Sequence, residues 1–536
     1  MLQSRLNHIP ADDKGMAGGS AASSEGRASP ARANRLKRRK TAGWDGMEYS
    51  VAFNGAQPEL ASGQPRKPRV LFLNPPHRAP LMRRYMCTYA SPLFLLPPNE
   101  LLQLAACARA WNGAEVEVLD AIAEARNEPF VHARIRQCAP DVLVALVGVD
   151  SIADDMACLD RMKGAFPALP VVVFGYYPTT FPETILQNSR ADFILRGEPE
   201  AVLSEFLSAV RTQRQPLDMI PALAGRRPDG TIFANAEKRI ENLDRLPFPD
   251  YALIDIRNYA EALLGGPCGA ILSARGCPYQ CSYCTPTFGR RLVMRSPEGV
   301  VAEMQALIGA GARVIRFLDD TFTCNRKRVM DICRLILERN VRVRWTCLSR
   351  LDTFDRETLA WMKRAGCARI LLGVESYSEK VLNYLKKGID PKTVNPQIQL
   401  IREAGIESWG FLLLGAPVET EEEFEKTFRG IMDSSLDFIS INILTPYQGT
   451  SFFEQVESGI DFSLIPYVCR FRDESVARSA AAHERRLFRA FYLRPATVWR
   501  RRGLVLRYPH RTLRLAFMML RHWGKTFHIH ETPGLP

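Results

Sequence analysis

Three cysteines in one short stretch constrain this chain more than any other feature. Cys277, Cys281 and Cys284 have the spacing C-x3-C-x2-C and follow a β-type run, Gly269–Ser273, and a loop marker, Arg275–Gly276. Thiolates are the soft ligands that iron–sulfur clusters require. This spacing lets three sulfurs from one loop reach three corners of a four-iron cluster. One iron then stays open to a small chelating molecule.

Two other interpretations of the cysteine triplet are a group of buried thiols and a structural zinc site. A closed zinc site takes four nitrogen or sulfur ligands. The thirty-nine residues after Cys284 contain neither His nor Cys to complete such a site. The pattern therefore favours an iron–sulfur cluster.

The composition is that of a large globular chain. At 536 residues and 46% hydrophobic content, it is long enough for two or three domains. Its thirteen cysteines are dilute and odd in number, which indicates thiols in a reducing cytoplasm rather than a disulfide scaffold. Met1–Asp13 has no apolar core of a signal peptide, and no run approaches the roughly 18 apolar residues of a membrane span. We expect a cytoplasmic protein.

The formal net charge of +13 is unevenly distributed, because Arg and Lys greatly outnumber Asp and Glu from Arg470 onward. Such a tail can contact anionic lipid, nucleic acid or an acidic partner, or can be a solvated helical face. Leu513–Trp523 has the pattern of a basic amphipathic helix. It predicts either peripheral membrane contact or a helix that covers the open side of the core. Nucleic acid is not the expected partner.

Composition and periodicity divide the chain into five predicted regions. Residues 1–67 form a disordered basic tail, 68–211 a doubly wound parallel (Rossmann-like) domain, 212–262 a connector, 263–450 a partial (β/α)6 barrel, and 451–536 a basic helical region. The expected fold class is therefore α/β.

Local signals predict finer features of these regions. A Pro-Asp-Gly turn predicts a small hairpin at Arg226–Ile232. One helix is expected to begin at about Pro396, because proline disfavours a helix interior. The barrel strands are predicted to end at Ser273, Leu318, Cys347, Gly373, Leu414 and Leu444, and several helices to stop at Gly311, Gly366, Gly388 and Gly405.

Ligands of parallel sheets bind at the carboxyl ends of the strands. In the Rossmann-like domain these ends carry glycines that let a ligand approach the backbone, together with polar and flat aromatic side chains. The candidate cofactor-binding residues there are Asn74, Asp150, Ser151, Gly175, Tyr176, Gly197 and Glu198.

The triplet, with Tyr283 before its last cysteine, resembles the signature of the radical SAM superfamily. This resemblance implies that the three cysteines bind a [4Fe–4S] cluster, which cleaves S-adenosylmethionine (SAM). It also gives roles to polar groups at the barrel strand ends. Asp319 or Asp320 would receive the SAM ammonium group, and Arg350 would pair with the SAM carboxylate. Glu375 would accept hydrogen bonds from the ribose hydroxyls.

Three further positions complete the site that the resemblance implies. Gly415 would let the backbone approach the adenine, and Tyr283 would pack against it. Tyr447, in the stretch Thr445–Thr450, is the candidate catalytic residue, as a radical or proton partner, with a packing tyrosine as the alternative. We expect Cys324 and Cys347 to be packing residues.

Residues 69–210, which open with Asn74–Pro76 and close with Arg196–Glu198, resemble the cobalamin-binding domain that precedes some radical SAM cores. Many cobalamin domains carry D-x-H-x-x-G, whose His ligates cobalt. The corresponding stretch here is Asp120–Ala125, with Ile122 in place of that His. If cobalamin binds, this motif supplies no lower ligand. A Rossmann-like domain that binds another ligand, or none, is the alternative.

The resemblance implies a radical SAM enzyme that uses cobalamin to methylate an unactivated carbon, or phosphorus, of a small-molecule or lipid substrate. Flavodoxin or ferredoxin would supply electrons. A cobalamin-associated radical cyclase or oxidoreductase without methyl transfer is the main alternative. A tRNA methylthiotransferase would carry a second three-cysteine cluster site in its N-terminal domain, and a non-catalytic cobalamin sensor would not need the triplet.

Overall fold

The computed structural model describes residues 66–497, except 79–80, 85–87, 91–94, 213–214, 262–263, 285–287, 457–459, 462–469, 472–473 and 496. Most of the predicted N-terminal tail and the predicted amphipathic segment Leu513–Trp523 lie outside the described residues. Among the described helices, none is both long enough and apolar enough to cross a membrane.

Seven strands form the first sheet, in the spatial order β4 (Glu115–Asp120), β1 (Arg69–Asn74), β5 (Val142–Leu146), β6 (Val171–Phe174), β7 (Phe193–Leu195), β8 (Leu223–Arg226) and β9 (Ile232–Ala234). The first five are parallel, as their continuous apolar runs predict. The predicted hairpin exists as β8 and β9. It extends the sheet antiparallel beyond β7 rather than standing apart as a connector.

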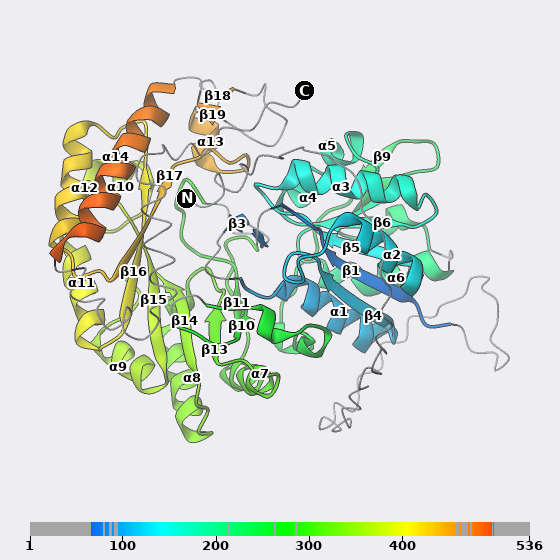
Figure 1. Ribbon diagram of the computed structural model, residues 1–536, viewed down its shortest axis with the longest axis horizontal. Coiled ribbons are helices and arrows are strands. Elements are labelled where there is room, and N and C mark those ends of the chain that lie inside the picture. Colours follow the sequence, from blue (N-terminus) through cyan, green and yellow to red (C-terminus); the bar gives the residue numbers. More distant parts are fainter. Residues whose placement is uncertain are drawn as a thin grey trace, which may run out of the picture.

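Helices cover both faces of this sheet (Figure 1). They are α1 (Asn99–Asn112), α2 (Glu128–Cys138), α3 (Ile152–Ala165), α4 (Tyr176–Thr180), α5 (Pro182–Gln187) and α6 (Glu200–Thr212). Val70 and Phe72 of β1 share a buried cluster with α1 and α6, whereas Leu71 and Leu73 share another with α2, α3 and α5. Because successive strand residues point to opposite faces, a sheet buried on both faces requires such an unbroken apolar run.

Six parallel strands form the second sheet in chain order: β10 (Cys268–Ile271), β13 (Val314–Phe317), β14 (Arg344–Ser349), β15 (Cys367–Glu375), β16 (Glu407–Leu414) and β17 (Phe438–Ile443). Between them lie α7 (Pro297–Gly309), α8 (Arg326–Glu338), α9 (Arg356–Arg364), α10 (Glu379–Tyr384), α11 (Pro391–Glu403) and α12 (Glu421–Asp433). Within the described residues β10 and β17 do not pair with each other, so the six units form a partial barrel (Figure 1).

The predicted start of α11 at Pro396 is wrong. The helix begins at Pro391, where the side chain of Asp390 accepts a hydrogen bond from the backbone N–H of Lys392 at 2.9 Å. Pro396 lies inside the helix and removes one backbone donor. The helix continues because its apolar face is buried, which outweighs the local cost of proline. The four predicted glycine stops all have positive φ, as a left-handed C-terminal residue requires.

The remaining elements are short, except for the last helix. They are β2 (Leu81–Arg83), β3 (Thr88–Ala90), β11 (Ala274–Arg275), β12 (Val293–Met294), β18 (Ile460–Asp461), β19 (Arg470–Phe471), α13 (Ser451–Val456), α14 (Glu474–Leu493) and the 3-10 turns η2 (Leu217–Met219), η3 (Leu243–Arg245), η4 (Tyr251–Leu253), η5 (Ile256–Asn258) and η6 (Phe322–Cys324). Helix α14 covers the edge strand β17, where the Tyr492 hydroxyl donates to the Ile439 carbonyl at 2.8 Å.

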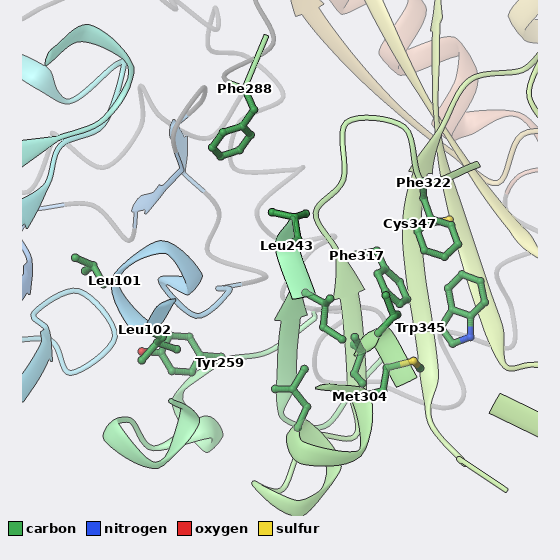
Figure 2. Packing of buried hydrophobic residues seen from close by; sticks show 14 of the residues in the cluster. Leu101, Leu102, Leu243, Tyr259, Phe288, Met304, Phe317, Phe322, Trp345 and Cys347 are labelled. Atoms are coloured by element: carbon green, nitrogen blue, oxygen red, sulfur yellow. The ribbon is translucent and has the colours of Figure 1, made fainter. Parts of the chain in front are cut away.

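One hydrophobic cluster is continuous across the two halves. Leu102 of α1 and Tyr259 of the connector belong to the same cluster as Phe317 and Trp345 of the barrel (Figure 2). The rings of Phe317 and Trp345 meet edge to face with centroids 5.5 Å apart. The shared core fixes the carboxyl ends of the two sheets relative to each other, and this is where the predicted site residues lie.

Candidate active site

The cysteine loop follows β11 at the carboxyl end of the barrel. Gly276, immediately before Cys277, has φ 87°, and a Cβ there would lie 2.2 Å from the Arg291 carbonyl oxygen. Only glycine therefore lets the chain turn into the loop at this point. Arg290 donates to the Cys284 carbonyl at 3.2 Å and also to the Tyr279 carbonyl, which holds the loop from its outer side.

The three thiols lie close enough to influence one another. Burial, then the Asp320 carboxylate and the other two thiols, raises the pKa of Cys284 to about 12. Burial also raises the pKa of Cys277. Cys284 is nevertheless exposed, so its thiol is accessible to a ligand. Positive iron ions would offset the mutual repulsion of three thiolates, so this loop fits a cluster.

Among the described side chains, no group of three or more His, Cys, Asp or Glu is arranged around a single metal ion. That arrangement differs from an iron–sulfur site, where each cysteine binds a different iron and the sulfurs stand further apart. The loop is therefore better suited to a cluster than to one zinc ion.

Asp319 and Asp320, both predicted to face SAM, have different environments. Asp319 is 1% exposed and accepts from the backbone N–H of Ser273 at 2.6 Å, from its hydroxyl at 2.5 Å, and from Ala274 N–H at 3.0 Å. It ties the end of β13 to the end of β10. Asp320 is exposed beside the cysteines, and burial by the surrounding walls, together with Asp319, raises its pKa to about 6. Of the two, only Asp320 has an exposed side chain.

Arg350 lies directly against the cysteine loop. Its guanidinium is 3.8 Å from the centre of the Tyr279 ring, and one nitrogen is 3.7 Å from the Cys281 sulfur. The same group makes a bidentate pair with Asp352 at 3.0 Å and donates to the Lys387 carbonyl at 2.8 Å. A donor to a cluster sulfur stabilises the thiolate form, so Arg350 has a role beside the cysteines in addition to the predicted carboxylate contact.

Glu375 is predicted to bind the ribose, but one of its oxygens is engaged by protein. Its Oε1 accepts from the Tyr283 hydroxyl at 2.9 Å and from the Lys387 ammonium at 2.8 Å. Glu375 has φ 65°, an uncommon value for a residue with a side chain. A Cβ at Gly373 would lie 2.5 Å from that oxygen, so this glycine makes room for the pair. The structure thus brings Tyr283 and Glu375 together, and their contacts with adenine and ribose stay predictions.

Gly415 ends β16 with φ 85°. Its N–H donates to Glu419 Oε2 at 2.6 Å, and a Cβ there would lie 3.1 Å from the Ala480 Cβ of α14. Burial raises the pKa of Glu419 to about 7, although the bond from Gly415 opposes this shift. The backbone at Gly415 is therefore fixed from two sides, which suits a close backbone contact with a flat ring.

At the carboxyl ends of β1, β4 and β5, the predicted cofactor residues form a buried network. Asn74 donates to Asp120 at 2.8 Å and accepts from Arg83 at 2.8 Å. Arg83 makes a fully buried pair with Asp155, which also accepts from the Ser151 hydroxyl at 2.8 Å. The side chains of Asn74 and Ser151 are thus buried and engaged by neighbouring side chains, and their contact with a cofactor stays a prediction.

Asp120 also caps its own turn, accepting from Ile122 N–H and Ala123 N–H at 3.1 Å. The turn at Asp120–Ala123 is therefore formed, although Ile122 stands where many cobalamin domains carry a cobalt-ligating His. Gly175, at the end of β6, has φ 141°, and a Cβ there would lie 2.6 Å from the Val147 carbonyl oxygen. The close packing of these two strand ends explains why glycine occupies this position.

Gly197 and Glu198 reach the barrel rather than an open strand end. Gly197 has φ 64° and turns the chain toward Glu198. Glu198 and Glu200 both pair with Arg275, at 2.6 and 2.7 Å, and all three side chains are at most 5% exposed. Arg275 lies two residues before Cys277. The structure therefore places Glu198 in a buried ion group behind the cysteine loop.

Tyr447 lies at the seam between the two halves, where its hydroxyl donates to Asp150 at 3.2 Å. The Tyr176 hydroxyl donates to the Gln448 carbonyl at 2.6 Å. The candidate catalytic tyrosine and two candidate cofactor residues thus meet each other across the seam.

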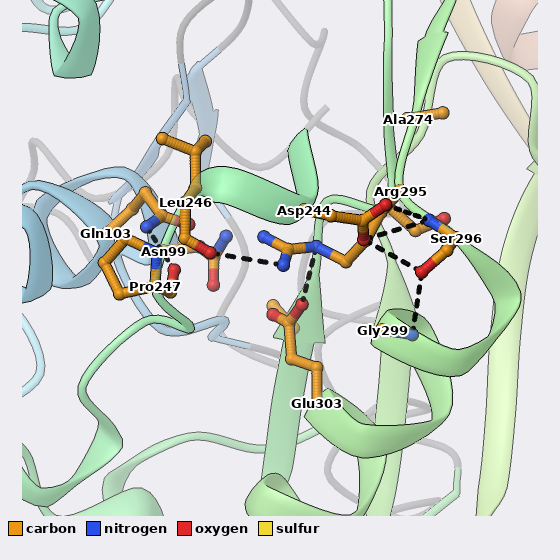
Figure 3. Close-up of polar contacts among 12 residues, drawn as sticks. Asn99, Gln103, Asp244, Leu246, Pro247, Ala274, Arg295, Ser296, Gly299 and Glu303 are labelled. Atoms are coloured by element: carbon orange, nitrogen blue, oxygen red, sulfur yellow. Dashed lines mark hydrogen bonds and ion pairs between the residues drawn. The ribbon is translucent and has the colours of Figure 1, made fainter. Parts of the chain in front are cut away.

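A small polar cavity of about 10 Å³ lies in the same seam, between α1 and the barrel. Its walls include Glu100, Arg275, Arg295 and Glu303, each with one buried side-chain atom that has no protein hydrogen-bond partner. Arg295 and Glu303 approach to 3.6 Å (Figure 3). Two carboxylate oxygens and two guanidinium nitrogens are the set that one water molecule can satisfy.

Sequence reasoning missed the partners of the site residues. Lys387 against Glu375 and Arg275 against Glu198 are buried charges far from their partners along the chain, and so is Asp155 against Arg83. The sequence could have indicated Arg275, because it lies next to the glycine that opens the cysteine loop. For Lys387 the sequence showed only that it precedes a predicted helix stop, Gly388.

Fold and site together define a two-part α/β enzyme, with a Rossmann-like sheet facing a partial barrel that carries a three-cysteine loop. The family model of the radical SAM superfamily matches residues 271–431. An uncharacterized methyltransferase of Pyrococcus horikoshii is 30% identical over 362 residues, covering 67% of this chain and 78% of that protein. The anaerobic magnesium-protoporphyrin IX monomethyl ester cyclase of Rubrivivax gelatinosus is 26% identical, covering 68% and 67%.

Two solved structures share the architecture. The cobalamin-dependent radical SAM enzyme OxsB, with aqua-cobalamin and SAM bound, matches with a TM-score of 0.68 and 16% identity, over 85% of this chain and 71% of that one. The radical SAM methyltransferase TsrM of Kitasatospora setae, with cobalamin and a [4Fe–4S] cluster, matches with a TM-score of 0.64 and 20% identity, over 80% and 92%. The chain belongs to the radical SAM superfamily, and its fold is that of cobalamin-dependent members.

Proposed function

We propose that this enzyme is a cobalamin-dependent radical SAM methyltransferase that acts on an unactivated carbon, or phosphorus, of a small-molecule or lipid substrate. The observation that carries the proposal is the position of the cysteine loop, Asp320 and Arg350 at barrel strand ends that meet the strand ends of a Rossmann-like sheet. The relative that shows the family is named a methyltransferase, and two structures with the same fold contain cobalamin.

The roles of this chain's residues follow from their surroundings. Cys277, Cys281 and Cys284 would hold the cluster, and Arg350 would donate to the Cys281 sulfur. Asp320 would receive the SAM ammonium group. When bound, the cluster and cobalamin supply electron transfer to SAM and a methyl group for the substrate. The surrounding protein excludes water and holds these groups in place.

We place the cobalamin-binding domain at residues 68–211, the connector at 212–262, the radical SAM core at 263–450 and the basic helical region at 451–536. Asn74, Ser151 and Gly175 would line the cobalamin side, with no histidine from the Asp120 turn as a lower ligand. A flavodoxin or ferredoxin would supply electrons in a reducing cytoplasm.

A radical cyclase is the second candidate, and one finding favours it specifically. The cyclase of Rubrivivax gelatinosus is similar over almost the same share of this chain as the methyltransferase. The two activities differ in the fate of the SAM methyl group, which reaches the product only in the methyltransferase.

The test is anaerobic purification and cluster reconstitution with hydroxocobalamin, followed by desalting and counts of iron and cobalt. We expect about four irons and one cobalt per chain, and Cys284→Ala should lose the iron while keeping the cobalt. SAM with a deuterated methyl group, dithionite and a metabolite extract should then give deuterium-labelled product. Iron without cobalt would contradict the methyltransferase proposal, and neither metal would contradict the cluster site as well.

A further inference from the structure

The loop after the last barrel strand, Thr445–Thr450, contacts the first sheet at two separate points. We infer that Tyr176 and Tyr447 form a clamp across the seam, and that they are positioning residues that set the spacing between the two sheets' carboxyl ends. The catalytic consequence rests on the proposed function. The contact itself does not.

The first contact point is Tyr176, at the start of α4. Its hydroxyl donates to the Gln448 carbonyl at 2.6 Å. The next residue, Gly449, has φ 85°, and a Cβ there would lie 2.7 Å from the Tyr176 hydroxyl oxygen. The loop therefore lacks a side chain at the place where the tyrosine of the other half approaches it. The positive φ already favours glycine at this position, and the approach of Tyr176, 273 positions away in the chain, is a second reason for it.

The second contact point is Tyr447. Its hydroxyl donates to Asp150, four residues after β5, at 3.2 Å. Its ring packs on the buried cluster that contains Tyr176 and Tyr177. Among the described residues that join this cluster, Tyr447 is the one contributed by the barrel. The loop is thus attached through both a hydroxyl and an aromatic face.

The two points lie at neighbouring strand ends, because β5 and β6 pair directly. A loop held at two such points cannot rotate about either one. Two internal bonds, from Tyr447 N–H to the Thr445 carbonyl at 3.0 Å and from Thr450 N–H to the Tyr447 carbonyl at 3.2 Å, stiffen it further. The position of the loop at the mouth of the barrel therefore depends on the position of the first sheet.

The clamp also changes the interpretation of three predicted residues. Tyr447 was the candidate catalytic residue, and Asp150 and Tyr176 were candidate cofactor residues. In this geometry they hold the two halves together at the edge of the proposed cofactor site. Loosening them should leave the cysteine loop and SAM cleavage intact, because Arg350 is held by Asp352 and the Lys387 carbonyl and the loop is held by Arg290. It should reduce the fraction of cleavage events that lead to product.

The contact is tested by hydrogen–deuterium exchange of the full-length chain, without any assay of activity. Tyr176→Phe should speed exchange of the amides in 445–450 at least fivefold, and Gly449→Ala should do the same for the segment 175–180. This reciprocity would not arise from a purely local change. Tyr492→Phe, which removes a comparable hydroxyl bond between α14 and β17, should leave both segments unchanged. Unchanged exchange in both seam variants would overturn the clamp.

The positioning role is tested in the reconstituted enzyme by counting 5′-deoxyadenosine formed per methylated product. Tyr176→Phe and Tyr447→Phe should raise this ratio about fivefold or more, with SAM cleavage within twofold of the native rate. A proportional loss of cleavage and product in Tyr447→Phe would instead make Tyr447 catalytic and overturn the positioning role. If the native enzyme cleaves no SAM, the proposed function fails, while the exchange experiment still decides the clamp.

Discussion

Asp319 and Asp320 are adjacent in the chain, yet Asp319 is buried whereas Asp320 is exposed. Asp319 closes the junction between β10 and β13 through Ser273 and Ala274. The carboxylate of Asp320 adds to the effect of burial in raising the pKa of Cys277 and of Cys284. One carboxylate is therefore used inside the fold, and the other lies beside the cysteine loop.

Replacement by asparagine separates the two roles. Asp319→Asn turns an amide toward the N–H groups that the carboxylate accepts, so it should lower the free energy of unfolding by about 2 kcal/mol. Asp320→Asn should not lower the free energy of unfolding, because the side chain is exposed and its raised pKa shows that the fold disfavours its charge, and it should lower kcat/KM for SAM cleavage about tenfold to a hundredfold. Denaturant unfolding and 5′-deoxyadenosine formation measure the two effects. If Asp319→Asn lowered SAM cleavage without lowering stability, Asp319 would be the residue that binds SAM.

The sequence could locate the strand ends but not the side chains that are already engaged there. The position of Asp319, Glu375 and Glu198 follows from local patterns of apolar runs and glycine. Their partners Ser273, Lys387 and Arg275 lie 46, 12 and 77 residues away. No local periodicity encodes such pairs, so free ligands and structural carboxylates look alike in the sequence.

At the scale of elements, the barrel strands were predictable because each is a short apolar run followed by a polar loop. All six end within two residues of their predicted positions. The hairpin β8–β9 was predicted as a unit, but its place at the sheet edge was not, because pairing with β7 is a non-local choice. The predicted start of α11 at Pro396 is wrong, because burial of the apolar face of the helix outweighs the cost of a proline in its interior.

Helix α7 carries an element-scale prediction, because it buries the carboxyl group of Glu303. That group lies against Arg295 (Figure 3) and accepts a hydrogen bond from the Tyr251 hydroxyl. Burial raises the pKa of Glu303 to about 7, although Arg295 opposes the shift. The folded state thus binds this proton more tightly than the unfolded chain. The stabilisation is complete below about pH 4.5 and is lost as the pH rises through about 7.

Glu303→Gln should therefore remove up to about 3 kcal/mol of pH dependence in the free energy of unfolding between pH 4.5 and 7. Glutamine keeps an oxygen that accepts from Tyr251, so the fold should persist. The control is Glu298→Gln on the exposed start of the same helix, which should leave the slope unchanged. Denaturant unfolding across this pH range is the measurement. An unchanged slope in Glu303→Gln would mean that Arg295 keeps the carboxyl ionised throughout.

At the scale of the whole molecule, the two halves are joined by a hydrophobic core and by buried charges next to it. Arg275 pairs with Glu198 and Glu200 in this seam, and its guanidinium also lies 4.7 Å from the centre of the Phe288 ring. Because Arg275 precedes the cysteine loop by one glycine, the ion group links the first domain to the position of the proposed cluster. Breaking this ion group should therefore change both the free energy of unfolding and the amount of cluster iron that the protein retains.

Arg275→Met should lower the free energy of unfolding by about 3–5 kcal/mol, because it leaves two buried carboxylates without a cation. Adding Glu198→Gln and Glu200→Gln to the same chain should recover most of that loss, since the unpaired charges are then gone. Arg291→Met, whose ion pair with Glu241 is at least 70% exposed, should change stability by less than about 1 kcal/mol. Denaturant unfolding and iron retained after desalting would be measured on all three.

If Arg275→Met loses iron and the triple variant retains it, the ion group positions the cysteine loop through charge balance. Iron loss in both would show that the guanidinium itself shapes the loop.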